Sequence, residues 1–376
     1  MLLNNSTGKK VIYFLFVFAC IPCGAQGDRE LMLFPVMDRN NIFGYIDQAG
    51  NLKIKHLFDL AYPFLDDRAI IKMGNQFGYI DKSGKIIVKP QYESAQDFYE
   101  DRAAVQIGGK YGYIDKSGAV PIAPQFDDAS RFSEGLAVIM IGDKCGYINK
   151  QGEIVINPKY DHTYIGSYAK STSSNIMASY YDRSSGYYIP SISQNRFRDF
   201  SGGLAAVQVG NKWGFINQRD AFIILPKFDE VSGFTDGMAV VKINDKYSFI
   251  NHNGDYVFDN FYDYIFPSFA TGKPKYFSEG LAAVKINDEW GYIDTSGKVV
   301  IKPQFSFAYA FSEGLARINM GRENSGYVDN TGKIVITPSF ISAEDFSEGL
   351  AVVWVKDPEG SIRKGQRSGY IDKTGQ

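Results

Sequence analysis

Histidine and cysteine are both scarce in this sequence, with three of each among 376 residues. The histidines His56, His162 and His252 are far apart and show no His-x-x-x-His spacing, so we expect neither a zinc site nor a histidine-based catalytic triad. Two cysteines lie within the segment 1–25, and the remainder of the chain has only Cys145. An intramolecular disulfide is therefore excluded there, and stability must come from packing.

The sequence also lacks a basic run and a long apolar run. Its 40 lysines and arginines are balanced by 42 aspartates and glutamates, so it lacks the positive footprint that nucleic acid requires. The longest apolar run falls short of the roughly 20 residues needed to span a bilayer. We therefore expect no nucleic-acid partner and no transmembrane segment.

The N-terminal segment 1–25 resembles a secretory leader. Lys9 and Lys10 precede the apolar run 11–21, and small residues lead to a cleavage site before Gln26. Removing 1–25 leaves 38 basic against 42 acidic residues. A second interpretation is a lipoprotein signal that ends at Cys20. Both predict export, to the periplasm, the medium or the cell surface.

Aromatic residues are abundant, with 25 tyrosines and 28 phenylalanines, and this favours β-sheet. The motif Gly44-Tyr45-Ile46-Asp47 recurs three times, with Asn149 in place of the aspartate in the last copy, and each copy starts 34 positions after the one before it. More distant copies follow at two periods or with short insertions, which makes nine full or degenerate units and a tenth that is cut short at Gln376. The glycine position of these copies is occupied by Gly78, Gly112, Gly146, Gly214, Ser248, Gly291, Gly326 and Gly369.

One unit can be interpreted physically from residue 281 onward. Residues 281–286, 290–294 and 298–301 alternate as strands do, and two tight turns join them. Asp294 suits the first position of the second turn, Gly297 ends it, and Pro303 stops the third strand. We therefore predict an all-β array of about nine three-stranded antiparallel units. An open, superhelical, solenoid-like array is preferred, and a closed propeller-like ring is the alternative.

Two aromatic positions recur in each unit, those of Phe305 and Phe311, and we expect them to stack between neighbouring units. The stretches 212–217 and 290–294, each followed by a Phe-Ser-Glu-Gly-Leu-Ala-like segment, resemble the WG-repeat (KWG) family over residues 30–376. The resemblance implies a bacterial β-repeat protein with no catalytic residues. Tryptophan occupies its motif position in only two units, and Asp220 stands where a hairpin glycine is expected.

The recurring acids do not predict an active site or a metal site. Glu100, Glu134, Glu279, Glu313 and Glu348 occur once per unit, whereas paired-carboxylate catalysis needs two acids in different environments across one cleft. The hairpin aspartates offer one carboxylate per loop, and calcium needs six to eight oxygens. We expect no catalysis, no metal and no cofactor, and we expect Cys145 to be a buried, inert thiol.

Irregular segments are the better candidates for binding. They are a degenerate unit at 180–213 and insertions near 261–276 and 356–367. The candidate partner-binding residues are Tyr164, Tyr168, Tyr180, Tyr181, Tyr187, Tyr188, Phe266 and Phe269. Sequence drift is the alternative explanation of these segments.

We predict an exported scaffold whose partner is an envelope or extracellular protein. The alternative is a carbohydrate- or cell-wall-binding module that uses exposed Tyr and Trp rings. Coplanar exposed rings along one groove would favour glycan, and an apolar patch rimmed by charge would favour protein.

Overall fold

The computed structural model describes residues 32–65, 67–161, 199–268, 275–356 and 366–376. It adds the backbone alone of two short hairpins, β1 (Leu2–Asn4) with β2 (Lys10–Ile12) and β18 (Ser179–Asp182) with β19 (Tyr187–Pro190). The leader expected at 1–25 otherwise lies outside the described residues. In the part of the chain that is described there is no helix, and so none that could cross a membrane.

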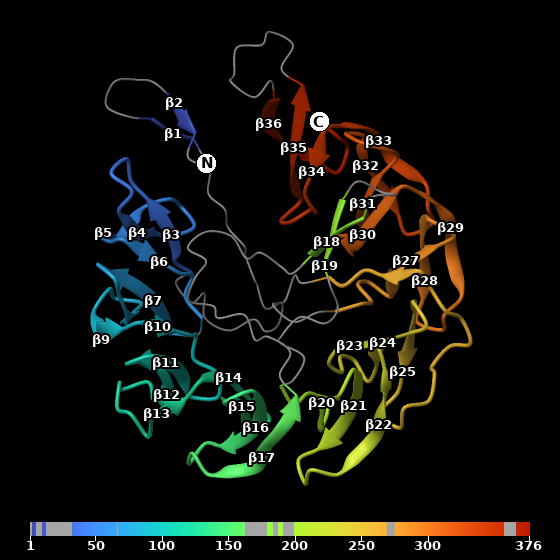
Figure 1. Ribbon diagram of the computed structural model, residues 1–376. Coiled ribbons are helices and arrows are strands. Elements are labelled where there is room, and N and C mark those ends of the chain that lie inside the picture. Colours follow the sequence, from blue (N-terminus) through green and yellow to red (C-terminus); the bar gives the residue numbers. More distant parts are fainter. Residues whose placement is uncertain are drawn as a thin grey trace, which may run out of the picture. The chain divides into compact units, whose positions relative to one another are not determined.

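Nine sheets of three or four antiparallel strands follow one another along the chain, which confirms the all-β tandem array (Figure 1). By internal contacts the chain divides into two compact units. The first contains the described residues up to Asp161, with 199–203 and 218–220, and the second contains most of the remainder.

The first compact unit holds four sheets. Their strands are β3 (Phe34–Met37), β4 (Phe43–Ile46) and β5 (Leu52–Phe58); β6 (Leu60–Ala61), β7 (Arg68–Met73), β8 (Gln76–Asp81) and β9 (Ile86–Tyr92); β10 (Ser94–Ala95), β11 (Ala103–Ile107), β12 (Lys110–Ile114) and β13 (Ile122–Phe126); and β14 (Asp128–Ser133), β15 (Leu136–Ile141), β16 (Lys144–Asn149) and β17 (Ile154–Asp161).

The second compact unit holds five sheets. Their strands are β20 (Leu204–Val209), β21 (Lys212–Asn217) and β22 (Phe222–Phe228); β23 (Glu230–Val231), β24 (Ala239–Ile243) and β25 (Lys246–Ile250); β26 (Tyr264–Ile265), β27 (Leu281–Ile286), β28 (Glu289–Asp294) and β29 (Val299–Phe305); β30 (Phe307–Ser312), β31 (Leu315–Asn319), β32 (Ser325–Asp329) and β33 (Ile334–Phe340); and β34 (Ser342–Ala343), β35 (Leu350–Lys356) and β36 (Gln366–Asp372).

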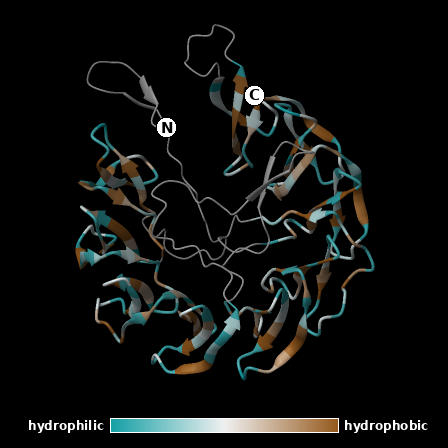
Figure 2. Ribbon diagram, viewed as in Figure 1, coloured by the Kyte–Doolittle hydropathy of each residue, from teal (hydrophilic) through white to brown (hydrophobic). Residues whose placement is uncertain are grey.

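The predicted three-stranded meander is present, and most sheets add a short strand that the sequence pattern did not predict. β27, β28 and β29 form the expected meander, although β29 continues through Pro303 to Phe305 and does not stop at the proline as predicted. β26, only two residues long, pairs with the free edge of β27. Two residues are too few to show the alternation that identifies a strand. Apolar colour follows the strands and polar colour follows the turns in Figure 2.

The repeated glycine lies where two strands approach closely. A Cβ atom added at Gly291 would lie 2.5 Å from the carbonyl oxygen of Ile301 on β29. Ser248 takes this position in its own unit, and there the third strand is replaced by two isolated bridges, Ile250 to Tyr256 and Tyr247 to Tyr262. The glycine therefore allows the third strand to pair closely, and its loss coincides with a bulged outer edge.

Aromatic side chains join consecutive units, but the Phe311 position pairs with the motif tyrosine and not, as predicted, with the Phe305 position. The ring of Tyr292 contacts that of Phe311 with centroids 4.9 Å apart, and its hydroxyl donates to the carbonyl of Tyr309 at 2.8 Å. The same ring pair recurs as Tyr45–Phe64, Tyr79–Phe98, Tyr113–Phe132, Phe215–Phe234 and Tyr327–Phe346. Apart from Phe64, which is half-buried, the rings of these pairs are buried in the core.

A buried carboxyl group, that of Asp128, interrupts this apolar core. Asp128 on β14 is 7% exposed, and burial raises its pKa to about 6, although it accepts a hydrogen bond from the N–H of Ala129 at 2.8 Å. A raised folded-state pKa means that protonation favours the folded state. The stabilisation from protonating Asp128 is complete below about pH 4, near the pKa of aspartate in the unfolded chain. It is lost as the pH rises through about 6, the pKa of Asp128 in the folded protein.

Asp128→Asn is therefore expected to stabilise the protein at pH 7.5 by up to about 3 kcal/mol, because the amide carries no charge to desolvate. The gain over the unsubstituted protein should shrink towards zero at pH 4. Urea denaturation of both proteins at the two pH values measures this difference. An equal effect at both pH values would contradict the assignment.

Candidate functional site

The recurring glutamates hold neighbouring units together. The carboxylate of Glu279 accepts a hydrogen bond from the N–H of Gly314 at 3.0 Å, and that of Glu313 accepts one from the N–H of Gly349 at 2.9 Å. Glu100 makes the same bond to Gly135. These contacts give the once-per-unit acids a cohesive role.

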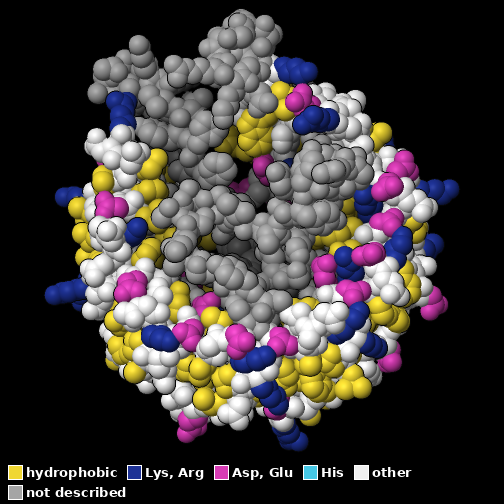
Figure 3. Space-filling view, viewed as in Figure 1, with side chains coloured by type: hydrophobic (Ala, Val, Ile, Leu, Met, Phe, Trp, Pro, Cys, Tyr) yellow, Lys and Arg dark blue, Asp and Glu magenta, His cyan; other side chains and the backbone are white. Residues whose placement is uncertain are grey.

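The hairpin aspartates are engaged within their own loops. Oδ1 of Asp294 accepts hydrogen bonds from the hydroxyl of Ser296 at 2.5 Å and from the N–H groups of Ser296 and Lys298. These bonds lower the pKa of Asp294, with the Ser296 hydroxyl contributing most. Within the described ranges no group of three or more His, Cys, Asp or Glu side chains could hold a metal ion. Both signs of charge are interspersed on the described part of the face in Figure 3.

Two further sequence expectations can be located. Cys145 is buried at 2% exposure, as predicted. His252 stacks on Phe234 with centroids 4.2 Å apart, which gives this hairpin histidine a packing role.

The structure locates only part of the predicted binding set. Tyr164, Tyr168 and Phe269 lie outside the described residues. The backbone of Tyr180 and Tyr181 lies on β18, and that of Tyr187 and Tyr188 on β19. The insertion near 356–367 also falls mostly outside the described ranges. Phe266 is the predicted residue whose side chain can be followed.

Phe266 belongs to a cluster of four aromatic rings in the second compact unit. Its half-buried ring meets Tyr309 at 5.4 Å, Phe307 at 5.6 Å and the buried Trp290 at 6.2 Å. The planes of Phe266 and Tyr309 are 76° apart, and those of Phe266 and Phe307 are 85° apart. Phe266 therefore meets its neighbours edge to face, and the four rings do not form a coplanar platform.

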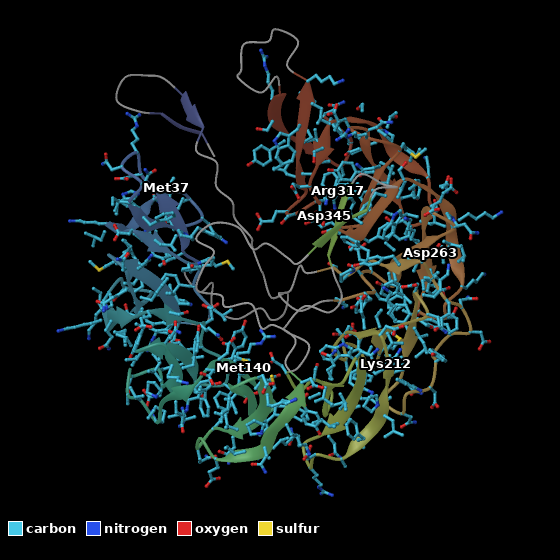
Figure 4. All side chains as sticks on the ribbon, viewed as in Figure 1. Met37, Met140, Lys212, Asp263, Arg317 and Asp345 are labelled. Carbon is cyan, nitrogen blue, oxygen red and sulfur yellow. The ribbon has the colours of Figure 1, made fainter. Side chains whose placement is uncertain are left out.

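A charged group borders this cluster. The guanidinium of Arg317 lies 3.5 Å from the centre of the Tyr309 ring and donates to the carbonyl of Ala343. Its Nε is 3.4 Å from Oδ1 of Asp345, and the two side chains lie together in Figure 4. Asp345 and its neighbour Glu344 are both exposed. We call Phe266, Tyr309, Arg317, Glu344 and Asp345 the ring–arginine cluster.

Arg317 was missed by the sequence analysis, although the repeat contains a signal for it. The same position of the other units is apolar throughout: Ile70, Ala104, Val138, Ala206, Val240, Ala283 and Val352. A charged side chain at a position that is otherwise apolar must be compensated by a partner, and here Asp345 supplies it. A search for charges that interrupt apolar positions would have found it.

The first compact unit shows how the degenerate repeat joins the array. The rings of Tyr147 and Phe200 lie with centroids 5.1 Å apart, although the residues are 53 positions apart in the sequence. In the equivalent pair, Tyr79 and Phe98 are only 19 positions apart. Gly203 donates to Glu134 across 69 residues, where Gly314 and Glu279 are 35 apart. Each separation is larger by 34, the length of one repeat. Residues 199–203 thus take the place next to Tyr147 and Glu134 that the immediately following repeat takes elsewhere.

These features show that the chain is a tandem β-repeat protein whose recurring side chains hold neighbouring repeats together. The WG containing repeat model matches residues 43–76, 77–111, 111–145, 146–169, 195–213, 213–247, 275–290, 290–322 and 326–354. The chain therefore belongs to the WG containing repeat family. The matches stop at 169 and resume at 195, on either side of the extra repeat length. No curated protein sequence matches significantly.

Solved structures resemble the chain only at the level of fold. A crystal structure of the eukaryotic initiation factor aligns with a TM-score of 0.51 and 11% identity, over 92% of this chain and 94% of that one. BamB from Moraxella catarrhalis aligns at 0.38 and 8%, over 83% and 95%. The WD40 beta propeller domain of Doa1 aligns at 0.28 and 10%, over 69% and 88%. The first supports a similar β fold, and the other two carry no argument at these scores.

Proposed function

We propose that this protein is a non-catalytic scaffold that binds another protein through positions where its repeat is broken. The regular side chains are committed to cohesion, as Tyr292 is to Phe311 and Glu313 is to Gly349. Recognition is then left to the departures from the repeat, of which the ring–arginine cluster is the clearest in the described residues.

The observation that carries this proposal is the chemistry of that cluster. An aromatic patch rimmed by Arg317, Glu344 and Asp345 has the composition of a protein-binding hot spot, in which aromatic and arginine side chains dominate. A sugar would need an exposed ring face, and Arg317 covers one face of Tyr309. Protein is therefore favoured over glycan, and glycan is an outcome for the test to detect.

We further propose that the scaffold is exported, because its segment 1–25 has the basic, apolar and small-residue regions of a leader. The partner would then be an envelope or extracellular protein. Cell fractionation followed by mass determination of the mature N-terminus tests export, and recovery of the full-length chain in the cytoplasm would contradict it.

The binding proposal can be tested with two variants and one control. Deleting 164–197 removes one repeat length and restores the usual separation of 19 between Tyr147 and Phe200, so folding should survive. Glu344→Lys reverses an exposed rim charge, and Asp143→Lys does the same on an exposed turn of the first unit. Each protein is used to capture partners from envelope extract, beside polysaccharide beads.

We expect the Asp143→Lys protein to recover the partner as the unsubstituted protein does. The deletion should recover less, and Glu344→Lys should recover about tenfold less because a rim charge controls encounter. If the deletion protein captures as much partner as the unsubstituted protein, the Tyr-rich segment is not a binding site. If Glu344→Lys does so, the ring–arginine cluster is not a binding site. Retention on polysaccharide alone would favour the glycan alternative.

A further inference from the structure

The outer strand of the β20–β22 sheet is exposed and apolar. β22 is an edge strand, paired to β21 alone in the sheet order. Phe222, Ile223 and Leu225 on it are all exposed, and Leu225, at 70%, is the most exposed of the large apolar side chains in the described residues. The strand is brown in Figure 2. Apolar residues at an unprotected sheet edge favour pairing with another strand.

The residue at the position of Leu225 separates β22 from the other outer strands. The position of Leu225 is held elsewhere by Lys55, Lys89, Ala123, Asn157, Lys302 and Thr337. Residues 221–225 contain no charge and no proline, and Pro226 and Lys227 follow at the end of β22. β13, which also lacks charge, is flanked by Pro121 and contains Pro124. Lysine is a residue that usually prevents edge-to-edge pairing. β33 also lacks charge but has the polar Thr337 at this position, so the exposed Leu225 is what distinguishes β22.

The apolar surface continues onto the next unit. The hairpin loop at Gly254 packs on β22, because a Cβ added there would lie 3.1 Å from the Ile224 side chain. Beyond this loop, Tyr256 and Phe261 are exposed and contact each other at 5.1 Å, and Val257 is exposed beside them. This is the bulged edge that accompanies Ser248. The two edges together expose on the order of 500 Å² of apolar side chain, a size that marks interaction sites.

We propose that β22 pairs antiparallel with β22 of a second copy of this chain, forming a symmetric dimer. A strand that pairs with itself about a twofold axis brings its own side chains together across the interface. At Lys55, Lys89 or Lys302 such pairing would bring like charges together, which is destabilising, whereas β22 would bring together Ile223 and Leu225. Two such patches would bury on the order of 1,000 Å², the lower bound for a stable interface.

The dimer is independent of the ring–arginine cluster, and a single substitution tests it. Leu225→Lys restores the residue type found at the same position on β5, β9 and β29. Because Leu225 is exposed, the monomer should keep its thermal midpoint. Thr337→Lys, at the equivalent exposed position of β33, is the matched control.

Sedimentation equilibrium measures the dimer dissociation constant. Protein concentrations from about 1 to about 100 µM cover the range in which many proteins self-associate. We expect the unsubstituted protein and Thr337→Lys to dimerise alike, and Leu225→Lys to weaken the dimer at least about tenfold. A protein that is monomeric throughout overturns the proposal. A dimer that Leu225→Lys leaves unchanged also overturns it, because another surface would then be responsible. Capture of a different protein through Leu225 by a monomer would assign β22 to that partner instead.

Discussion

Phe311→Ala is expected to destabilise the protein by about 3–5 kcal/mol, one of the two largest effects among these predictions. Phe311 is 3% exposed, and its ring packs against that of Tyr292. Its carbonyl oxygen accepts a hydrogen bond at 2.7 Å from the hydroxyl of Ser278 in the preceding repeat. Truncation leaves a cavity between two sheets, and rigid strands on both sides limit its collapse. Urea denaturation followed by circular dichroism measures the loss, and a thermal midpoint lower by several degrees should accompany it.

Glu313→Gln is the comparison for this substitution. Partial burial opposes ionisation of Glu313, but hydrogen bonds from Gly349 and the ammonium of Lys373 outweigh it, and its pKa is lowered. Glutamine keeps one oxygen acceptor for these N–H groups, so the change should cost less than about 1 kcal/mol. A measured activity that Glu313→Gln abolishes and Phe311→Ala preserves would contradict the scaffold proposal.

Gly291→Ala is expected to cost about 3 kcal/mol, although it adds only one methyl group. That methyl group would lie 2.5 Å from the oxygen of Ile301 and 2.7 Å from the nitrogen of Pro303, both backbone atoms that cannot rotate away. β29 would have to separate from β28, as the outer edge does beside Ser248. Denaturation midpoints, and amide hydrogen exchange of the residues on β29, would report this separation.

Gly369→Ala is the matched control, because this glycine holds the same repeat position and has no atom within 4 Å of the added Cβ. Its substitution should change stability by less than about 0.5 kcal/mol. Equal losses of stability from Gly291→Ala and Gly369→Ala would mean that the glycine is needed for its backbone conformation and not for the close approach of the neighbouring strand.

The candidate site was predictable in part. Phe266 could be proposed because it lies in an insertion with a high aromatic content. Its neighbours Tyr309 and Arg317 follow it by 43 and 51 positions and both belong to the next sheet. Only the register between successive sheets brings them to Phe266. The preference for an open array, and the tyrosines of 164–188, stay predictions.

The all-β class, the repeat length of 34, the three-stranded meander and the family could all be predicted from the order of residues, because alternation and turn residues are local and were copied many times. Which repeats contact one another could not be predicted from the sequence. The folded chain pairs Phe200 with Tyr147 across an extra repeat length, and it brings Arg317 to Tyr309 and Asp345. Such contacts depend on how neighbouring sheets pack in three dimensions, and periodicity along a chain carries no record of that.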